Sequence, residues 1–265
     1  ERPMATIIYP SPVFGPVKSR RLGRSLGINL LPEDGKVCNF DCIYCECGFN
    51  ADTLPKKKLP AREFVKSELN RRLKAMKEAG ETLDALTFAG NGEPTSHPHF
   101  AEIAEDVKAL RDTWFPEAKV CLLTNATHLT NDRVFEAVMK LDKACLKLDT
   151  VDPDYINLVD RPQCRYDVNV LIDRMKACGG KCVIQSMFLK GAWQGVDVDN
   201  TTDKYVLPWV DAVAAIKPAG VDVYTISRDT PDKALQKATD EELMRIVNLL
   251  RARGIDAHAF DWLQS

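Results

Sequence analysis

Four of the nine cysteines lie within ten consecutive positions, at Cys38, Cys42, Cys45 and Cys47. Thiolate sulfur is a soft ligand that suits iron–sulfur clusters. Three cysteines spaced C-x3-C-x2-C can surround one corner of a cubane cluster, which leaves one of its irons open to a small molecule. The sequence therefore predicts an iron–sulfur site held by Cys38, Cys42 and Cys45.

Two other interpretations of the cysteines stay open at this point. Cys47 could complete a structural zinc site, although such sites usually draw their four ligands from two separated pairs. A second cluster could use Cys164, Cys178 and Cys182. Burial as small apolar groups is the preferred expectation for these three and for the two remaining cysteines.

Short apolar runs alternate with longer amphipathic ones along most of the chain, a pattern typical of parallel strands joined by helical crossovers. The predicted strands are 24–32, 84–90, 118–124, 143–150, 181–189 and 220–227, with 255–260 as a possible further strand. The predicted helices are 61–79, 99–114, 131–141, 165–178, 204–216 and 239–254. Six strand–helix units are fewer than the eight of a closed barrel, so the fold class is α/β, with a partial barrel or a doubly wound sheet. Residues 1–23 are predicted to be an N-terminal extension and residues 24–265 a single domain.

The composition restricts the partners of the chain. Its 265 residues are 45% hydrophobic and carry a net charge of −2, which provides material for a core and lacks the basic surplus of a general nucleic-acid binder. No apolar run reaches the length of a membrane span, and no secretory signal is visible. With its clustered thiols, the chain is expected to be cytoplasmic and to have no membrane partner.

The segment CNFDCIYC (38–45) resembles the signature of the radical S-adenosylmethionine superfamily, including an aromatic residue, Tyr44, before the third cysteine. The resemblance implies a partial (β/α)6 barrel and a [4Fe–4S] cluster whose open iron binds S-adenosylmethionine. It implies reductive cleavage of that cofactor to a 5′-deoxyadenosyl radical, which abstracts hydrogen from a substrate. It also implies an electron donor of the flavodoxin or ferredoxin type.

Further motifs extend the resemblance over nearly the whole chain. AGNGEPT (89–95) is similar to the family's GGE motif, whose backbone meets the methionine amino group, although Asn91 stands where many members have glycine. LLTNAT (122–127), LKLDT (146–150) and VIQSM (183–187) end predicted strands where related enzymes bind the ribose and carboxylate of the cofactor. The resemblance therefore implies these S-adenosylmethionine contacts: Tyr44, Gly92, Glu93, Asn125, Asp149 and Gln185. The last three could instead be cap or turn residues, as could Asn200, which resembles an asparagine after the fifth strand of some members.

Several segments resemble the branch that contains the wyosine-base synthases, which modify a guanine of transfer RNA. They are FGPVKSRRLGRSLGINLLP, CIYCECG, GNGEPT, KLDT, LVDRP and TISRDTP. Archaeal-type members bind a second cluster through cysteines before the radical motif, and this sequence has none before Cys38. The expected function is a radical S-adenosylmethionine enzyme acting on an unidentified small molecule, peptide or transfer RNA. The alternatives are a wyosine-type synthase and a non-catalytic iron–sulfur or zinc protein.

Charged side chains outside these motifs are candidates for substrate binding. Arginines can hold an anionic group by paired hydrogen bonds, and five stand near the motifs: Arg20, Arg21, Arg24, Arg161 and Arg228. His97 and His99 are expected to flank the helix that begins near residue 99 rather than to bind metal. No residue is assigned a catalytic role of its own.

Overall fold

The computed structural model describes residues 6–19, 21–227 and 230–260. Eight strands form its main sheet: β1 (Val13–Ser19), β2 (Gly23–Ile28), β3 (Ala85–Phe88), β4 (Lys119–Thr124), β5 (Lys143–Lys147), β6 (Val183–Met187), β9 (Gly220–Tyr224) and β11 (Ala257–Phe260). The longer helices are α1 (Arg62–Glu78), α2 (Phe100–Trp114), α3 (Asp132–Met139), α5 (Val168–Ala177), α6 (Asp203–Ile216) and α7 (Asp240–Ala252). These elements correspond to the six predicted strand–helix units and to the possible further strand.

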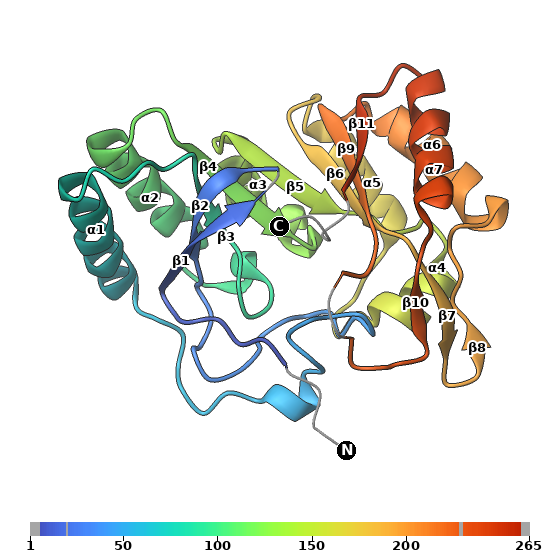
Figure 1. The fold of residues 1–265 in the computed structure, drawn as a ribbon, viewed down its shortest axis with the longest axis horizontal. Helices are drawn as coiled ribbons and strands as arrows, with labels where there is room; N and C mark the ends of the chain where they lie inside the picture. The colour runs from blue at the N-terminus through green and yellow to red at the C-terminus, as the bar shows by residue number, and fades with distance from the viewer. Residues whose placement is uncertain (1–5, 20, 228–229, 261–265) are drawn as a thin grey trace.

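The main sheet has the order β1-β2-β3-β4-β5-β6-β9-β11. Neighbours from β2 to β11 are parallel, whereas β1 pairs antiparallel with β2. The sheet curls, and the helices lie along its outer side (Figure 1). The predicted partial barrel is confirmed, and the doubly wound alternative is wrong because the helices do not cover both faces. Residues 13–19, expected in an extension, add a strand to the same sheet.

The ends of the helices follow local sequence signals. The Asn131 side chain caps α3 by accepting hydrogen bonds from the backbone amides of Arg133 and Val134. Thr239 and Glu242 form a reciprocal capping box at the start of α7. Gly254 follows α7 with φ +74°, a left-handed conformation that favours glycine.

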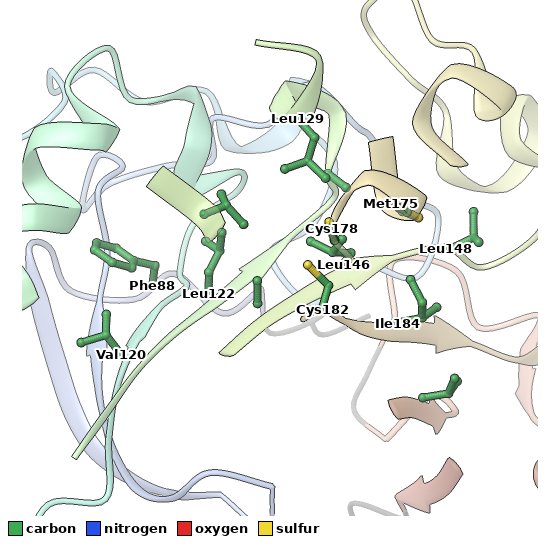
Figure 2. Packing of buried hydrophobic residues seen from close by; sticks show 14 of the residues in the cluster. Phe88, Val120, Leu122, Leu129, Leu146, Leu148, Met175, Cys178, Cys182 and Ile184 are labelled. Carbon is green, nitrogen blue, oxygen red and sulfur yellow. The ribbon is translucent and has the colours of Figure 1, made fainter. Parts of the chain in front are cut away.

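The apolar core lies between the convex face of the sheet and the helices. Alternate strand residues point to this face and are almost fully buried: Leu26, Ile28, Leu86, Phe88, Leu122, Leu146 and Ile184. Leu129 and Met175, from the turn before α3 and from α5, belong to the same cluster (Figure 2). Because this face is continuous and apolar, it fixes the curvature and hence the position of the strand ends.

The hollow of the half-barrel is polar. Successive strand residues point to opposite faces, so the residues between the core positions face the hollow: Ser25, Thr87, Cys121, Lys147, Gln185 and Asp222. The Ser25 and Thr87 hydroxyls share a hydrogen bond of 2.7 Å. Arg21, in the turn between β1 and β2, reaches Asp222 of β9 with an N–O distance of 3.4 Å. This ion pair links the two sides of the curled sheet.

A small second sheet, which the sequence analysis did not predict, stands beside the main one. It consists of β7 (Leu189–Trp193), β8 (Val196–Asp197) and β10 (Leu235–Lys237), in the order β10-β7-β8. A short helix, α4 (Pro153–Tyr155), and a π-helical turn (Ile156–Asp160) precede it in the chain. A second apolar cluster joins Leu189 and Leu235 of these strands to Ile43, and Tyr44 packs against it. The small sheet therefore supports the cysteine loop.

No helix in the described part of the chain is long and apolar enough to span a bilayer.

We expect alanine substitutions at two positions of α7 to lower the free energy of unfolding by very different amounts. Leu250 is fully buried, whereas Met244 is 41% exposed on the same helix. Leu250→Ala leaves a cavity and should lower the free energy of unfolding by about 2–5 kcal/mol, whereas Met244→Ala should change it by no more than about 0.5 kcal/mol. Urea denaturation followed by circular dichroism measures both, and equal losses would contradict the assigned packing of α7.

Candidate functional site

The cysteine loop leaves β2 at the carboxyl edge of the sheet, where parallel α/β folds place their active sites. Cys38, Cys42 and Cys45 are partly buried, and Cys47 is 4% exposed. The Cys45 amide donates to the Cys42 carbonyl at 3.1 Å, and the Gly48 amide donates to the Cys45 carbonyl at 2.9 Å. Two tight turns therefore carry three of the loop's four cysteines.

The loop is bound to the turn after β3 through an isolated parallel bridge between Val37 and Gly92. The Val37 amide donates to the Asn91 carbonyl at 2.9 Å, and the Glu93 amide donates to the Val37 carbonyl at 3.1 Å. Gly92 has φ +123°, and a Cβ atom there would stand 1.9 Å from the Val37 carbonyl oxygen. Only glycine permits this approach. Gly92 of the GNGEPT motif therefore allows the cysteine loop to contact the turn after β3.

The Glu93 carboxylate ties the same turn to the end of β4. Its Oε1 accepts hydrogen bonds from the Thr95 amide (3.1 Å), the Thr95 hydroxyl (2.6 Å) and the Thr124 hydroxyl (2.5 Å). Its Oε2 accepts a hydrogen bond from the Asn125 amide at 2.7 Å. Glu93 is 2% exposed, so its carboxylate is buried and fully engaged with protein groups.

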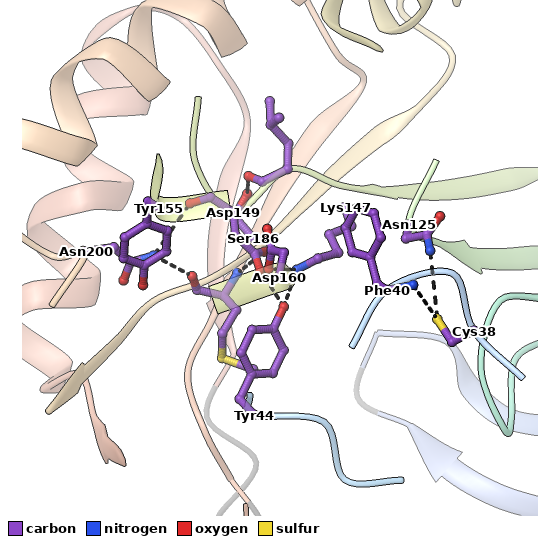
Figure 3. Close-up of polar contacts among 12 residues, drawn as sticks. Cys38, Phe40, Tyr44, Asn125, Lys147, Asp149, Tyr155, Asp160, Ser186 and Asn200 are labelled. Carbon is purple, nitrogen blue, oxygen red and sulfur yellow. Dashed lines mark hydrogen bonds and ion pairs between the residues drawn. The ribbon is translucent and has the colours of Figure 1, made fainter. Parts of the chain in front are cut away.

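Asn125 connects the end of β4 to the cysteine loop. Its Nδ2 donates to Asn39 Oδ1 at 2.7 Å. The same Nδ2 lies 3.9 Å from Cys38 Sγ (Figure 3). Its Oδ1 accepts hydrogen bonds from the amide and the hydroxyl of Thr127. The Phe40 amide is also directed at Cys38 Sγ, at 3.5 Å. Two donors therefore face the first thiol of the loop.

Tyr44, Lys147, Asp149 and Asp160 form a buried polar network beside the loop (Figure 3). The Tyr44 hydroxyl donates to Asp149, and the Lys147 ammonium contacts both of these groups. Lys147 Nζ also lies 2.9 Å from Asp160 Oδ1. The second Asp149 oxygen accepts a hydrogen bond from the Met187 amide at 2.9 Å. One ammonium therefore lies between two buried carboxylates and offsets part of their charge.

Burial and charge shift the titration of this network. Burial raises the pKa of Asp160, and repulsion from Asp149 adds to that rise against the attraction of Lys147. Burial would lower the pKa of Lys147, but the two carboxylates outweigh it and raise the pKa well above its usual value. The ammonium therefore stays protonated, and the network retains an excess of acidic groups near Cys42.

Lys36 is a second lysine of this region, and it contacts the cysteine loop itself. Its Nζ donates to the Gly48 carbonyl at 2.8 Å and lies 3.6 Å from Asp41 Oδ1. Burial would lower the pKa of Lys36, but attraction to the three cysteines of the motif and to Asp41 outweighs it and raises the pKa.

The thiols of the loop are not equivalent. Burial raises the pKa of Cys38 to about 12 and raises that of Cys42 well above its usual value. A hydrogen bond from Cys47, followed by the charge of Lys36, lowers the pKa of Cys45 against the effect of burial. Cys45 is therefore the readiest of the three to form a thiolate, and binding of metal by the other two would release protons.

The chemistry of the loop fits a multi-iron cluster. Three thiols from one loop are a donor set that suits a cubane, in which each cysteine binds a different iron. The three motif thiols interact electrostatically, and donors and two ammonium groups surround them.

Gln185 and Asn200 occupy different surroundings. Gln185 is half-buried on β6, in register between Lys147 and Asp222, and faces the hollow. Asn200 is fully buried, accepts a hydrogen bond from the Leu189 amide and donates to the Met187 carbonyl, both at 2.9 Å. Thr202, not Asn200, is the N-cap of α6, so Asn200 holds the connection between β6 and β7.

The other predicted cysteines have different surroundings. Cys164 is exposed, and its Sγ accepts a hydrogen bond from Asn39 Nδ2 at 3.7 Å, whereas Cys178 and Cys182 are buried in the apolar core. The three therefore do not form a second site. His97 is buried beside the Pro60 carbonyl, and His99 precedes α2.

Two of the five arginines, Arg20 and Arg228, lie outside the described residues. Arg24 pairs with Glu81 on the outside of the sheet. Arg161 alone among the three described candidates touches the cysteine loop: it lies 3.5 Å from Asp41, over the rings of Phe49 and Trp193.

Sequence reasoning missed three charged residues of this site, Lys36, Lys147 and Asp160. Lys36 stands in a loop with no periodic signal, and Asp160 ends an unpredicted π-helical turn. Lys147 could have been found, because it alternates with core residues on β5 and must therefore face the hollow.

Comparison with known proteins agrees with this geometry. The Radical SAM superfamily profile matches residues 33–192. A UPF0026 protein of Helicobacter pylori is 30% identical over 237 residues, which cover 88% of this chain and 71% of that protein.

Solved structures share the fold at low sequence identity. A radical SAM methyltransferase from Sphaerobacter thermophilus superposes with a TM-score of 0.65 at 17% identity, over 89% of this chain and 66% of that chain. Archaeal TYW1 superposes with a TM-score of 0.52 at 14% identity, over 87% of this chain and 72% of that chain. These matches establish the half-barrel alone and not the reaction. By its profile match, the chain belongs to the radical SAM superfamily and is an enzyme that uses a [4Fe–4S] cluster and S-adenosylmethionine.

Proposed function

We propose that Cys38, Cys42 and Cys45 bind the [4Fe–4S] cluster at the mouth of the half-barrel. The observation that carries this proposal is the Val37–Gly92 bridge, which holds a three-thiol loop against the carboxyl ends of β3 and β4. The donors near Cys38 and the ammonium groups near Cys45 and Cys42 provide surroundings suited to thiolate ligands.

S-adenosylmethionine would then lie between this loop and the strand ends. The proposed contacts are Tyr44, Gly92, Glu93, Asn125, Asp149 and Gln185. The carboxylates of Glu93 and Asp149 are engaged with protein groups, so these residues would act by holding the backbone of the GNGEPT turn, Asn125 and Tyr44 in place. Gln185 faces the hollow with its amide and suits a direct contact with the cofactor.

A cluster held by these cysteines would supply the electron for reductive cleavage of S-adenosylmethionine, and the chemistry gained would be abstraction of hydrogen from the substrate. The polar hollow would hold the reacting part of that substrate away from water. The substrate remains one of three classes: a small molecule, a peptide or transfer RNA. The proposed reductant is a flavodoxin or ferredoxin, in keeping with the family's need for an electron donor.

The cysteine assignment predicts the iron content. Anaerobically reconstituted protein should bind about four irons per chain and form 5′-deoxyadenosine with dithionite and S-adenosylmethionine. Cys38→Ala, Cys42→Ala and Cys45→Ala should each lose most of the iron and the product, measured by iron assay and chromatography.

Cys164→Ala is the matched control, because Cys164 is exposed and outside the motif. It should retain the iron and the product of the unsubstituted protein. Full iron content in the Cys42→Ala protein would overturn the assignment.

The Val37–Gly92 bridge predicts that a side chain at position 92 would impair binding of the cluster. Gly92→Ala must displace the Val37 carbonyl and with it the cysteine loop, so the iron content should fall severalfold. Gly80→Ala is the control: φ is +70° there too, but no atom lies within 4 Å of the added Cβ, and its cost should be only about 1–2 kcal/mol of stability. Circular dichroism confirms folding, and equal iron contents in the two variants would contradict the role of the bridge.

The wyosine-type alternative makes its own prediction. A transfer-RNA enzyme binds phosphates, and its affinity falls by roughly 10³–10⁵ between 50 and 200 mM salt when six to ten contacts form. The net charge of −2 leads us to expect only weak binding of unmodified transfer RNA, with little salt dependence. Filter binding at several salt concentrations measures this, and a steep salt dependence would favour the transfer-RNA substrate.

A further inference from the structure

Lys36 is an unusual residue to find buried beside the cysteine loop. Its side chain is 1% exposed. A buried ammonium costs free energy unless it is paired and hydrogen-bonded, and Lys36 makes one hydrogen bond, to the Gly48 carbonyl at 2.8 Å, and one looser ion pair, with Asp41 at 3.6 Å. These two contacts leave part of its charge to be balanced elsewhere.

Asp41 does not supply that balance alone. Its Oδ1 also accepts a hydrogen bond from the Asn50 amide at 2.8 Å, and its Oδ2 lies 3.5 Å from the Arg161 guanidinium. Two cations therefore share one carboxylate. The charge of the Lys36 ammonium is therefore only partly balanced by Asp41.

The Lys36 ammonium lies within the loop that carries the thiols. It donates to the Gly48 carbonyl, and the Gly48 amide in turn donates to the Cys45 carbonyl at 2.9 Å. Asp41, 3.6 Å from the ammonium, directly precedes Cys42. Attraction to the three motif cysteines accordingly helps to raise the pKa of Lys36. Charge and hydrogen bonds directed at cluster sulfurs are among the factors that set the potential of an iron–sulfur centre.

The direction of the effect follows from the charges. A [4Fe–4S] core of charge 2+ with three thiolates carries −1, and one electron from the reductant changes the core to 1+ and the total to −2. A fixed positive charge stabilises the more negative state more strongly. A buried ammonium is screened less by salt and water than an exposed one.

We propose that Lys36 is a positioning residue that raises the reduction potential of the cluster by balancing the charge of its thiolate ligands. This inference rests on the proposed cysteine ligation. It assigns to Lys36 a role in how readily the electron donor reduces the cluster, separate from the binding of substrate.

A redox titration of reconstituted protein, followed by electron paramagnetic resonance of the reduced cluster, tests this proposal. Lys36→Met removes the charge and should lower the ratio of reduced to oxidised cluster about tenfold at a fixed potential, or about 59 mV for a one-electron couple. Lys36→Arg keeps a cation and should restore most of the ratio. Lys57→Met removes an exposed lysine that pairs with Glu33 and should leave the potential unchanged.

Asp41→Asn separates an electrostatic role from a structural one. It removes a negative charge from the same pocket and keeps an acceptor for the Asn50 amide, so the ratio should rise, opposite to the effect of Lys36→Met. Mere disturbance of the loop would not shift the two variants in opposite directions. If Lys36→Met fails to fold, the ratio of reduced to oxidised cluster in the Asp41→Asn protein tests the electrostatic role by itself.

The outcomes distinguish this inference from the function on which it rests. Unsubstituted protein that binds no cluster would refute the proposed ligation. A full cluster with the same potential in the unsubstituted, Lys36→Met and Asp41→Asn proteins would refute the role of Lys36 and leave the ligation standing. Shifts of Lys36→Met and Asp41→Asn in the same direction would also refute the role of Lys36.

Discussion

The contact between the Val37 carbonyl and the backbone of Gly92 is the constraint on which the site depends. It brings a loop that follows β2 against a turn that follows β3, at a distance that only a residue without a Cβ permits. The Glu93 carboxylate then fastens that turn to the end of β4. The Asn125 side chain, at that strand end, donates a hydrogen bond to Asn39 of the cysteine loop. Loop, turn and strand end therefore form one body, positioned by the apolar convex face of the sheet.

Charge is the second constraint on this site. Thiolates and carboxylates gather at the mouth of the half-barrel, and burial disfavours their charged forms. Two lysines oppose this effect. Lys147 lies between Asp149 and Asp160, whereas Lys36 pairs with Asp41 and donates to the Gly48 carbonyl of the cysteine loop. Each of these two groups of acidic side chains therefore has a buried ammonium that offsets part of its charge.

The features that could be predicted from the sequence are those that depend on a local pattern of residues. Periodicity located the six strand–helix units, and the spacing of Cys38, Cys42 and Cys45 located the loop. It did not predict β7, β8 and β10, because strands of two to five residues leave too short a pattern. It also missed Lys36, since a single lysine in a loop carries no periodic signal. The contact between Tyr44 and Lys147 joins residues 103 positions apart, and only the folded sheet brings them together.

The motif residues show how a resemblance and a physical role can differ. Glu93 and Asp149 match positions where contact with the cofactor is expected, yet Glu93 already accepts four hydrogen bonds from protein donors, three at Oε1 and one at Oε2. A carboxylate only accepts, so its two oxygens can meet two amides and two hydroxyls at once. The NH₂ group of a carboxamide would instead stand against one of these donors. The negative charge of Glu93 therefore stabilises the turn after β3 and its link to the end of β4.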